Sequence, residues 1–567
     1  MRFAGFTLAL AGIFTGSALG QTPTVGGLVN NYSNTLPGLP NYGIAEGSIF
    51  SIYGTNLSST TLGATLPLQT TLNGVSASVT VKGTTTSPLL YFVSSGQINA
   101  VLPSATPVGT GSITVTNSGG TSAAFPITVV ESAFGLLTTN YGSGPAQGYD
   151  ASINPNNQYI LFGFSEAANP GDTLELWGTG LGPVPGDATY VSVPTAQVYI
   201  GGLPARIGYS GRSGYPGLDQ INVVVPSGVT GCYVSVVVET GNFVSNFGTL
   251  PVAASGRVCT DPDNPLTASV LDQLGQTGSL NIGVISVSQL INPGITVDGV
   301  VYGAATTDKG LANFSKITSA QFNSGAFPAA LDGYSSVGSC FVEFFTTSGD
   351  VTSSELTSGD VTLPVPFQFT SLNAGADVNI NGPDGAIAMP LLTLNGVDSY
   401  TTPTGTAAFI PATGGAFTFG NGSGGGAAGV GAFTTPQIQI PAAVTWTNLN
   451  SISPVTRSNG LTVNWTGGAA GTHVDITGIS LASIGTSNYL AGYFTCRAPS
   501  EAGTFTVPPT VLLSLPPSST ISKAGISIST AVLLLSNFGT LVNFTAPNLD
   551  VGVMAVDLTN LVYVTFN

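Results

Sequence analysis

Hydrophobic and polar residues alternate in short runs along most of this chain. In "SIFSIYG" Phe50 and Ile52 fall on one face, and in "DTLELWG" Leu174 and Leu176 do the same. Alternation with a period of two is typical of strands that bury one face. The runs are separated by "NG", "GG", "PG" and "SGG", which favour turns. The pattern therefore predicts strands over nearly the whole length.

Helical spacing is scarce. Only "PLTASVLDQLGQ" and "KGLANFSKITSAQFNSG" could hold short helical turns. The segment "AGISISTAVLLLSNFGTLVNF" carries no charge, but Ser, Thr, Asn and Gly interrupt it, so we expect two strands there rather than a membrane span. The predicted fold class is all-β.

One unusual strand occurs twice. "SGQINAVLP" ends at Pro103 and "LDQINVVVP" ends at Pro226, 123 residues later. "EGSIFSIYGTNL" likewise matches "PGDTLELWGTGL", and in a later pair of segments Ser122 corresponds to Ser245. Two copies of one module of about a hundred residues, with turn signals at short intervals, predict two β-sandwiches.

The repeated strand has a structural interpretation in both copies. We expect Ile98 and Ile221 to point into the cores, because the neighbouring residues are polar amides. The amides are Gln97, Asn99, Gln220 and Asn222. They should point outward and bond the backbone of neighbouring loops, although an amide platform for sugar hydroxyls is an alternative.

The order of segments in each copy resembles the IPT/TIG branch of immunoglobulin-like domains. The resemblance rests on "PGDTLELWGTGL", "VYIGGLPARIGYSG", "INVVVPSGVTG" and "VSVVVETGNFVSNF". With "GRVCTDP", the pair resembles an uncharacterised Solibacter-type domain of secreted acidobacterial proteins, and "LNAGADVNINGPDG", "GLTVNWTGG" and "FTCRAPSEAGTFTVPPTVLLSLPP" resemble segments of the same kind of protein. The resemblance covers residues 25–255 well and the rest loosely. It implies a secreted or surface array of β-sandwiches and no particular reaction.

These observations predict a domain order. The tandem immunoglobulin-like sandwiches should span residues 25–135 and 140–256. Further β-rich, sandwich-like domains should follow at 265–440 and 441–567, after a signal peptide at 1–20.

Composition narrows the choice of partners. Charged residues are 6% of the chain, and 10 basic against 26 acidic residues give a net charge of −16. A chain that is 42% hydrophobic is too apolar for disorder. No basic surface for nucleic acid or anionic lipid is expected from this balance.

The first twenty residues have the pattern of a secretory signal. Arg2 precedes the apolar "FAGFTLALAGIFTG", and the small residues of "ALG" precede Gln21, which predicts cleavage after Gly20. A membrane anchor fits less well, because the apolar stretch is short and "QTPT" follows it. We therefore expect a secreted or cell-surface protein without a membrane span in the mature chain.

Four cysteines fit an oxidising compartment. An even count in an exported protein favours disulfides, and four buried thiols are the alternative. Cys232 should pair with Cys259, because the hairpin near residues 240–244 folds the chain back on itself. Cys340 and Cys496 should then pair with each other.

Two pairs of residues are candidates for binding. Tyr53 and Trp177 are equivalent in the two copies and lie on the face away from the core; they could stack on sugar rings, or pack beneath a loop or at a domain joint. Asp261 and Asp263 in "TDPDNP" could hold calcium at a domain junction, or form part of a rigid linker turn. Apart from calcium, no cofactor is expected.

Catalytic patterns are sparse. The single histidine, His473, lies two positions from Asp475, but no Gly-x-Ser-x-Gly turn supplies a nucleophile. The stretch "GNGSGGGAAGVG" lacks the Lys and the strand–helix context of a phosphate-binding loop. A glycosidase needs only two carboxylates, which sequence cannot pair. We assign no catalytic residue.

Two functional classes follow from these observations. The favoured one is an exported non-catalytic multidomain β-sandwich protein for surface adhesion, matrix building or glycan binding. The alternative is an extracellular carbohydrate-active enzyme with an acidic pair in the C-terminal half.

The chain has only four lysines to protect its strand edges, and its closing segment "NLVYVTFN" is expected to end the protein with a bare edge. Contact with itself or with a glycan or other surface polymer through such edges follows as a hypothesis. The alternative is that other strands of the same chain cover them.

Overall fold

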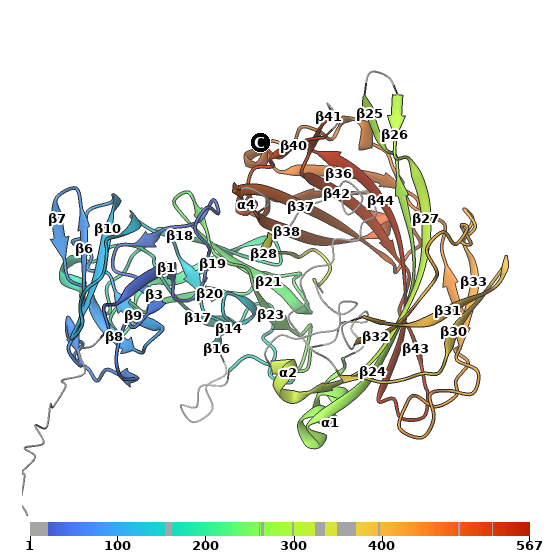
Figure 1. Ribbon diagram of the computed structural model, residues 1–567, viewed down its shortest axis with the longest axis horizontal. Coiled ribbons are helices and arrows are strands. Elements are labelled where there is room, and N and C mark those ends of the chain that lie inside the picture. Colours follow the sequence, from blue (N-terminus) through green and yellow to red (C-terminus); the bar gives the residue numbers. More distant parts are fainter. Residues whose placement is uncertain are drawn as a thin grey trace, which may run out of the picture.

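The computed structural model describes residues 21–152, 161–259, 261, 266–297, 300–323, 335–348, 370–394, 397–485, 488–523 and 526–567. Over these ranges the chain forms two β-sandwiches in succession and then a larger module built on one long sheet (Figure 1). Strands far outnumber helices, so the predicted all-β class is confirmed. The predicted signal peptide at 1–20 lies outside the described residues.

The first sandwich packs two sheets around one core. One sheet has the order β1 (Thr24–Asn30), β3 (Ile49–Thr55), β9 (Gln97–Val101), β8 (Leu89–Val93), β4 (Leu62–Gly63). The other has β2 (Ile44–Ala45), β12 (Phe125–Val130), β10 (Gly109–Asn117), β6 (Val75–Val81), β5 (Thr71–Leu72), with β11 (Gly120–Thr121) and β7 (Thr84–Thr86) beside it. Phe50, Ile52 and Ile98 are fully buried between the sheets, as their alternation predicts.

The second sandwich repeats this plan. Its strands are β13 (Gly135–Leu136), β14 (Thr138–Asn140), β15 (Ser143–Ala146), β16 (Gly148–Asp150), β17 (Thr173–Thr179), β18 (Ala196–Ile200), β19 (Leu203–Arg212), β20 (Asp219–Val224), β21 (Gly231–Thr240), β22 (Phe243–Val244) and β23 (Gly248–Val252). Strand β19 pairs with both β18 and β20, so it connects the two layers. Trp177 lies opposite Gln220 as Tyr53 lies opposite Gln97.

Small polar details recur in both sandwiches. The Ser122 hydroxyl accepts the amide of Val115 at 3.0 Å, and the equivalent Ser245 hydroxyl accepts that of Val238 at 2.9 Å. A Cβ on Gly54 would lie 2.0 Å from the Thr24 carbonyl oxygen, and one on Gly178 would lie 2.0 Å from the Phe134 ring and 2.6 Å from the Gly135 carbonyl oxygen. The repeated Tyr/Trp-Gly-Thr sequence is thus required because a neighbouring strand approaches closely.

The repeated amides behave differently from the expectation. Ile98 and Ile221 are fully buried, as predicted. The Gln97 side chain, however, donates to Asn99 Oδ1 at 2.8 Å, and Gln220 donates to Asn222 Oδ1 at 2.9 Å. These amides therefore satisfy each other along the strand rather than bonding loop backbone, because residues two apart lie side by side on one face.

Buried hydrogen bonds join the two sandwiches. The Thr179 hydroxyl accepts the Ile49 amide at 2.8 Å and donates to the Gly217 carbonyl at 2.6 Å. The Tyr91 hydroxyl donates to the Pro216 carbonyl at 2.8 Å. Desolvated polar contacts of this kind fix the geometry of a joint, because breaking one leaves a buried group without a partner.

The buried ion pair Arg212–Asp219 organises the loops at this joint. Asp219 also accepts the backbone amides of Gly180 and Leu181 at 2.7 and 2.8 Å. Arg212 donates its other amino group to the Gly182 carbonyl at 2.9 Å. Burial raises the pKa of Asp219 to about 6, and the charge of Arg212 opposes that rise.

The C-terminal module begins with a short helix and two long strands. Its elements up to residue 440 are α1 (Ala268–Thr277), β24 (Ser279–Asn292), β25 (Ile295–Val297), β26 (Val300–Tyr302), β27 (Ala305–Thr318), α2 (Ser319–Asn323), β28 (Cys340–Ser348), β29 (Thr370–Ser371), β30 (Asp377–Gly382), β31 (Gly385–Leu394), β32 (Val397–Thr401), β33 (Gly415–Gly420) and β34 (Ile438–Ile440). Helix α1 lies in the first segment expected to hold helical turns. Most of the second such segment is strand β27, and only its end is helical.

The remaining elements complete the module. They are β35 (Thr445–Trp446), β36 (Leu461–Thr466), β37 (His473–Gly485), β38 (Asn488–Pro499), β39 (Thr504–Val507), α4 (Pro509–Ser514), β40 (Thr520–Lys523), β41 (Ile526–Ser529), β42 (Ala531–Phe538), β43 (Val542–Phe544) and β44 (Val551–Val564). The long sheet has the order β28-β38-β37-β42-β44-β24-β27-β32-β31-β30-β33-β34, so it runs across residue 440. The ranges expected for the two C-terminal domains stay a prediction. None of the helices in the described residues is long and apolar enough to cross a bilayer.

The closing strand lies inside the sheet. Strand β44 runs parallel to β24 from Val551 to Asn560 and antiparallel to β42 from Asp557 to Val564 (Figure 1). Within "NLVYVTFN", Asn560 pairs with both β24 and β42, and Thr565 and Asn567 exchange backbone hydrogen bonds with Val455, so the predicted bare edge is wrong at both ends of the segment. Between them, Leu561–Val564 pair with β42. Strand β44 thus pairs with β24, which lies far from it in the sequence. The alternation of hydrophobic and polar residues within one strand does not indicate which other strand will be its neighbour.

Two disulfides close loops of different size. Cys232 bonds Cys259 and Cys340 bonds Cys496, the pairing expected from the sequence. Cys340 and Cys496 lie directly opposite each other on β28 and β38. The second bridge therefore covalently links strands that the sheet already pairs.

Removing residues 551–567 should unfold the C-terminal module rather than only reduce self-association. The segment contributes these buried hydrophobic side chains: Val551, Val553, Met554, Val556, Leu558, Leu561, Val564 and Phe566. At about 1.5–3 kcal/mol each, their loss is comparable to or larger than the roughly 5–15 kcal/mol net stability of a typical domain. Limited proteolysis and urea unfolding of the truncated chain measure this, and a protease-resistant truncated C-terminal half would contradict it.

Candidate functional site

The outer face of the second sandwich gathers aromatic, acidic and amide side chains. Trp177 on β17 lies opposite Gln220 on β20, and Glu175 lies between Tyr149 on β16 and Asn222 on β20. Side chains directly opposite each other in an antiparallel pair share one face, and Leu174 and Leu176 occupy the other. We call Tyr149, Glu175, Trp177, Gln220 and Asn222 the aromatic face.

Glu175 holds both rings of the aromatic face. The Tyr149 hydroxyl donates to Glu175 Oε2 at 2.5 Å, and Trp177 Nε1 donates to Oε1 at 3.0 Å. The two rings meet edge to face, with centroids 5.8 Å apart and planes at 67°. All three side chains are half-buried, so each keeps part of its surface open to solvent. The rings are thus fixed before any ligand arrives.

The equivalent face of the first sandwich is plainer. Tyr53 is 38% exposed and lies opposite Gln97, with Ser51 and Asn99 in the next row. The residue equivalent to Glu175 is Ser51, which bonds Asn31 rather than an aromatic ring. Tyr53 therefore presents one exposed aromatic ring, whereas Trp177 packs edge to face against Tyr149 and is hydrogen-bonded to Glu175.

Sequence reasoning found part of this surface. It placed Tyr53 and Trp177 in equivalent outward positions, which the strand pairing reproduces, but their binding role stays a prediction. It missed Glu175 and Tyr149. Glu175 could have been found, because it stands two residues before Trp177 in an alternating strand. Tyr149 could not, because only the β16–β17 pairing brings it there.

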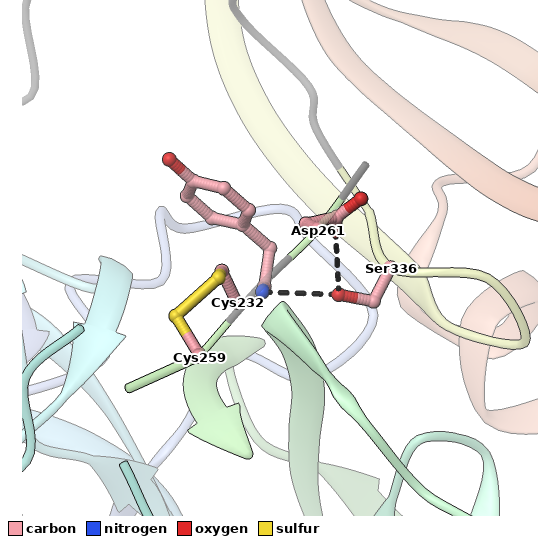
Figure 2. The surroundings of a disulfide bond; sticks show 5 residues. Cys232, Cys259, Asp261 and Ser336 are labelled. Carbon is pink, nitrogen blue, oxygen red and sulfur yellow. Dashed lines mark hydrogen bonds between the residues drawn. A yellow bond between two sulfur atoms is a disulfide. The ribbon is translucent and has the colours of Figure 1, made fainter. Parts of the chain in front are cut away.

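Of the acidic pair expected near the domain junction, Asp261 lies beside a disulfide (Figure 2). Figure 2 shows Asp261 next to the Cys232–Cys259 bridge, where the Ser336 hydroxyl lies 3.3 Å from its Oδ2. Ser336 Oγ in turn accepts the backbone amide of Tyr233 at 3.0 Å. Asp263 lies outside the described residues. Within those residues no group of three or more His, Cys, Asp or Glu side chains could hold a metal ion, and the calcium site stays a prediction.

A second polar cluster lies on the long sheet. Asp475, Ser536 and Thr559 stand directly opposite one another on β37, β42 and β44. Arg497 binds both Asp475 oxygens at 2.8 Å. The hydroxyls of Ser536 and Thr559 lie 2.6 Å apart, and Thr559 donates to Asp557 at 2.7 Å. We call these five residues the Asp475 network.

The single histidine borders this network. His473 is 5% exposed and stacks on Phe538, with ring centroids 5.3 Å apart and planes at 14°. Burial raises the pKa of Asp557 to about 6, and the charge of Asp475 adds to the rise. Two nearby carboxylates, one in an ion pair and one that protonates readily, are the arrangement on which acid–base chemistry depends. Sequence reasoning could not pair Asp475 with Asp557, because they are 82 residues apart.

Comparisons with known proteins assign no family to the chain. No protein-family model matches it, and no curated protein matches it. Among solved structures, SGBP-B of a Bacteroides ovatus mixed-linkage glucan utilization locus, in complex with a mixed-linkage heptasaccharide, is 12% identical, with 50% of this chain and 69% of that chain covered and a TM-score of 0.19.

Two further solved structures cover more of the chain. The plexin A4 extracellular region is 10% identical, with 89% of this chain covered and a TM-score of 0.15, and the chain spans 31% of its length. The S-layer protein SbsC is 10% identical, with 95% of this chain and 54% of that chain covered and a TM-score of 0.15. Scores this low carry no argument about function.

The Asp557→Asn substitution should flatten the pH dependence of stability. The pKa of Asp557 rises from 3.8 to about 6 on folding, so the folded state binds this proton more tightly than the unfolded chain. The stabilisation is full below about pH 4 and is lost as the pH rises to about 6. We expect urea unfolding of the wild type to lose about 1 kcal/mol or more over this interval through Asp557.

The control for this measurement is Asp384→Asn, at an exposed turn between β30 and β31. It should leave the wild-type pH profile unchanged. A wild-type decline between pH 4 and 6 that persists undiminished in Asp557→Asn would contradict the assignment.

Proposed function

We propose that this chain is an exported, non-catalytic protein whose β-sandwiches bind neutral glycan, and that it serves adhesion or matrix building at a surface. The observation that carries the proposal is the aromatic face of the second sandwich. Two rings held by one carboxylate, beside a pair of amides, offer an apolar platform with hydrogen-bonding groups at its edge.

This combination suits the chemistry of a sugar ring. One face of a pyranose presents C–H groups that pack on an aromatic ring, and its hydroxyls need donors and acceptors in fixed positions. Glu175 accepts hydrogen bonds, while Gln220 and Asn222 both donate and accept. The low charge of the chain suits a neutral polymer, which offers no ionic contacts.

The rigid joint between the sandwiches supports binding to a polymer rather than to a single sugar. A single face with half-buried rings makes few contacts with a sugar. Those contacts must offset the translational and rotational entropy lost on binding, so each face alone should bind weakly. The bonds from Thr179 and Tyr91 across the joint hold the Tyr53 and Trp177 faces in one relative position. A glycan long enough to contact both faces would meet the second face at a high effective concentration once the first is bound. Its overall affinity would therefore exceed that of either face alone.

Export is supported by the disulfides and by the sequence. Bridges such as Cys232–Cys259 and Cys340–Cys496 persist in oxidising compartments. The signal pattern in residues 1–20 agrees with this destination. Secretion, cleavage after Gly20 and membership of the IPT/TIG branch belong to the proposal.

A carbohydrate-active enzyme is the second candidate. The observation in its favour is the Asp475 network, which brings together two carboxylates of the C-terminal half as that hypothesis required. Asp475, Arg497 and His473 are all nearly fully buried, however. A polysaccharide would have to reach groups that the folded chain covers, so the open aromatic face is the better-supported site.

Trp177→Ala should strongly weaken the retention of the mature protein by neutral polysaccharides. Removing the ring deletes the platform and leaves the two bonds of Glu175 reduced to one. We expect affinity gel electrophoresis to show at least about tenfold weaker binding, since each 1.4 kcal/mol corresponds to a factor of ten. Tyr53→Ala should have a smaller effect.

The matched control is Tyr141→Ala, which removes an aromatic ring that is 86% exposed on a turn of the same sandwich. Retention unchanged in Trp177→Ala, with a wild-type melting temperature, would overturn the proposal. The wild type could instead release reducing sugars from the same polysaccharides while Asp557→Asn does not. That result would replace the glycan-binding proposal with the carbohydrate-active enzyme.

A further inference from the structure

A cavity of about 280 Å³ lies between the second sandwich and the C-terminal module. One wall comes from the paired strands β18 and β21, with Tyr199, Ser235 and Glu239. The opposite wall comes from α4 and the residues before it, with Val511 among them, and Phe247 completes the apolar lining. The cavity is therefore made by two bodies that are far apart in sequence.

The walls of this cavity are fixed by packing and hydrogen bonds. Phe247 and Val237 of the sandwich share one buried core with Val511 of α4. The Ser339 hydroxyl accepts the Ser235 amide at 3.2 Å, which ties β21 to the start of β28. A junction built on a common core keeps its shape, so the cavity is a built feature rather than a gap between mobile domains.

Acidic and aromatic groups meet in the cavity. Tyr199 lies opposite Val237, and Glu239 stands one row along on the same face of the strand pair. Burial raises the pKa of Tyr199, and the charge of nearby Glu239 raises it further. No ion pair in the described part of the chain involves Glu239. The cavity thus holds a carboxylate, two aromatic rings and apolar walls.

We propose that this cavity binds a protonated primary amine carried on a body no larger than a single sugar ring or amino-acid side chain. Glu239 supplies a charge-assisted acceptor, and the rings of Tyr199 and Phe247 supply the electron-rich faces that attract an ammonium group. The volume limits the ligand to one small unit. The net charge of −16 favours the approach of a cation.

This inference goes beyond the proposed glycan binding and does not depend on it. The aromatic face lies on the β16–β17–β20 layer, whereas the cavity is lined by β18 and β21 of the other layer. A primary ammonium could come from a hexosamine residue of a glycan or from a lysine side chain. The chemistry is the same, and the experiment separates the two sources.

The test is isothermal titration calorimetry of the full mature chain with three probes: glucosamine, N-acetylglucosamine and N-acetyl-lysine methylamide. We expect binding of at least one amine and none of N-acetylglucosamine. Glu239→Gln keeps the side-chain shape but removes the charge, and should weaken binding by about ten- to a hundredfold. Glu131→Gln, an exposed carboxylate elsewhere, is the matched control.

A second variant separates binding from folding. Leu513→Trp on α4 should fill the cavity without changing any charge, and it should also abolish binding. A preference for glucosamine identifies a hexosamine, and a preference for the lysine derivative identifies a protein partner. No amine binding by the wild type, equal binding of the N-acetylated probe, or undiminished binding by Glu239→Gln and Leu513→Trp would overturn the proposal. If Trp177→Ala loses polysaccharide retention but still binds the amine, the amine-binding proposal is supported independently of glycan binding.

Discussion

The parallel pairing of β44 with β24 holds the C-terminal half of this protein together. It joins residues 282–291 to residues 551–560, so this part of the sheet forms only when two segments far apart in the sequence come together. Strand β42 then pairs with β44, β37 with β42, and β38 with β37, up to the disulfide at Cys340 and Cys496. Every element of the cavity wall contributed by the C-terminal module depends on this order, because α4 packs on the strands that the pairing places.

Charge is scarce in this chain, and several of its charged residues form ion pairs with one another. Arg212–Asp219 fixes the joint between the sandwiches, Arg497–Asp475 lies on the long sheet, and Arg257 binds Asp150 and Asp172 near the first disulfide. Removing one partner of Arg212–Asp219 or Arg497–Asp475 would leave an uncompensated buried charge, which costs about 3–5 kcal/mol. The outer surface relies instead on hydroxyls and amides, which bond each other as Gln220 and Asn222 do.

The two sandwiches show how one scaffold supports different surfaces. Gly54 and Gly178, Ser122 and Ser245, and the amide pairs occupy equivalent positions in the two copies and make the same kind of contact in each. The residues between them are free to change. Ser51 in the first copy and Glu175 in the second stand at the same place, yet only the carboxylate can hold two rings at once.

The sequence by itself determined the local structure and the repeat. Alternation placed Phe50, Ile52, Leu174 and Leu176 in the cores, and comparison of the copies placed Tyr53 and Trp177 on matching outer positions, because a strand has a fixed period of two. The disulfide pairing also followed from the order of the chain.

Only the tertiary structure decided which strands become neighbours. It placed β44 inside a sheet instead of at an edge, set Tyr149 beside Glu175, and brought Asp557 near Asp475. It also made the cavity where Glu239 faces α4. These contacts join residues far apart in the chain, and their selection depends on how well whole sheets and cores fit together, which the period of a single strand does not encode.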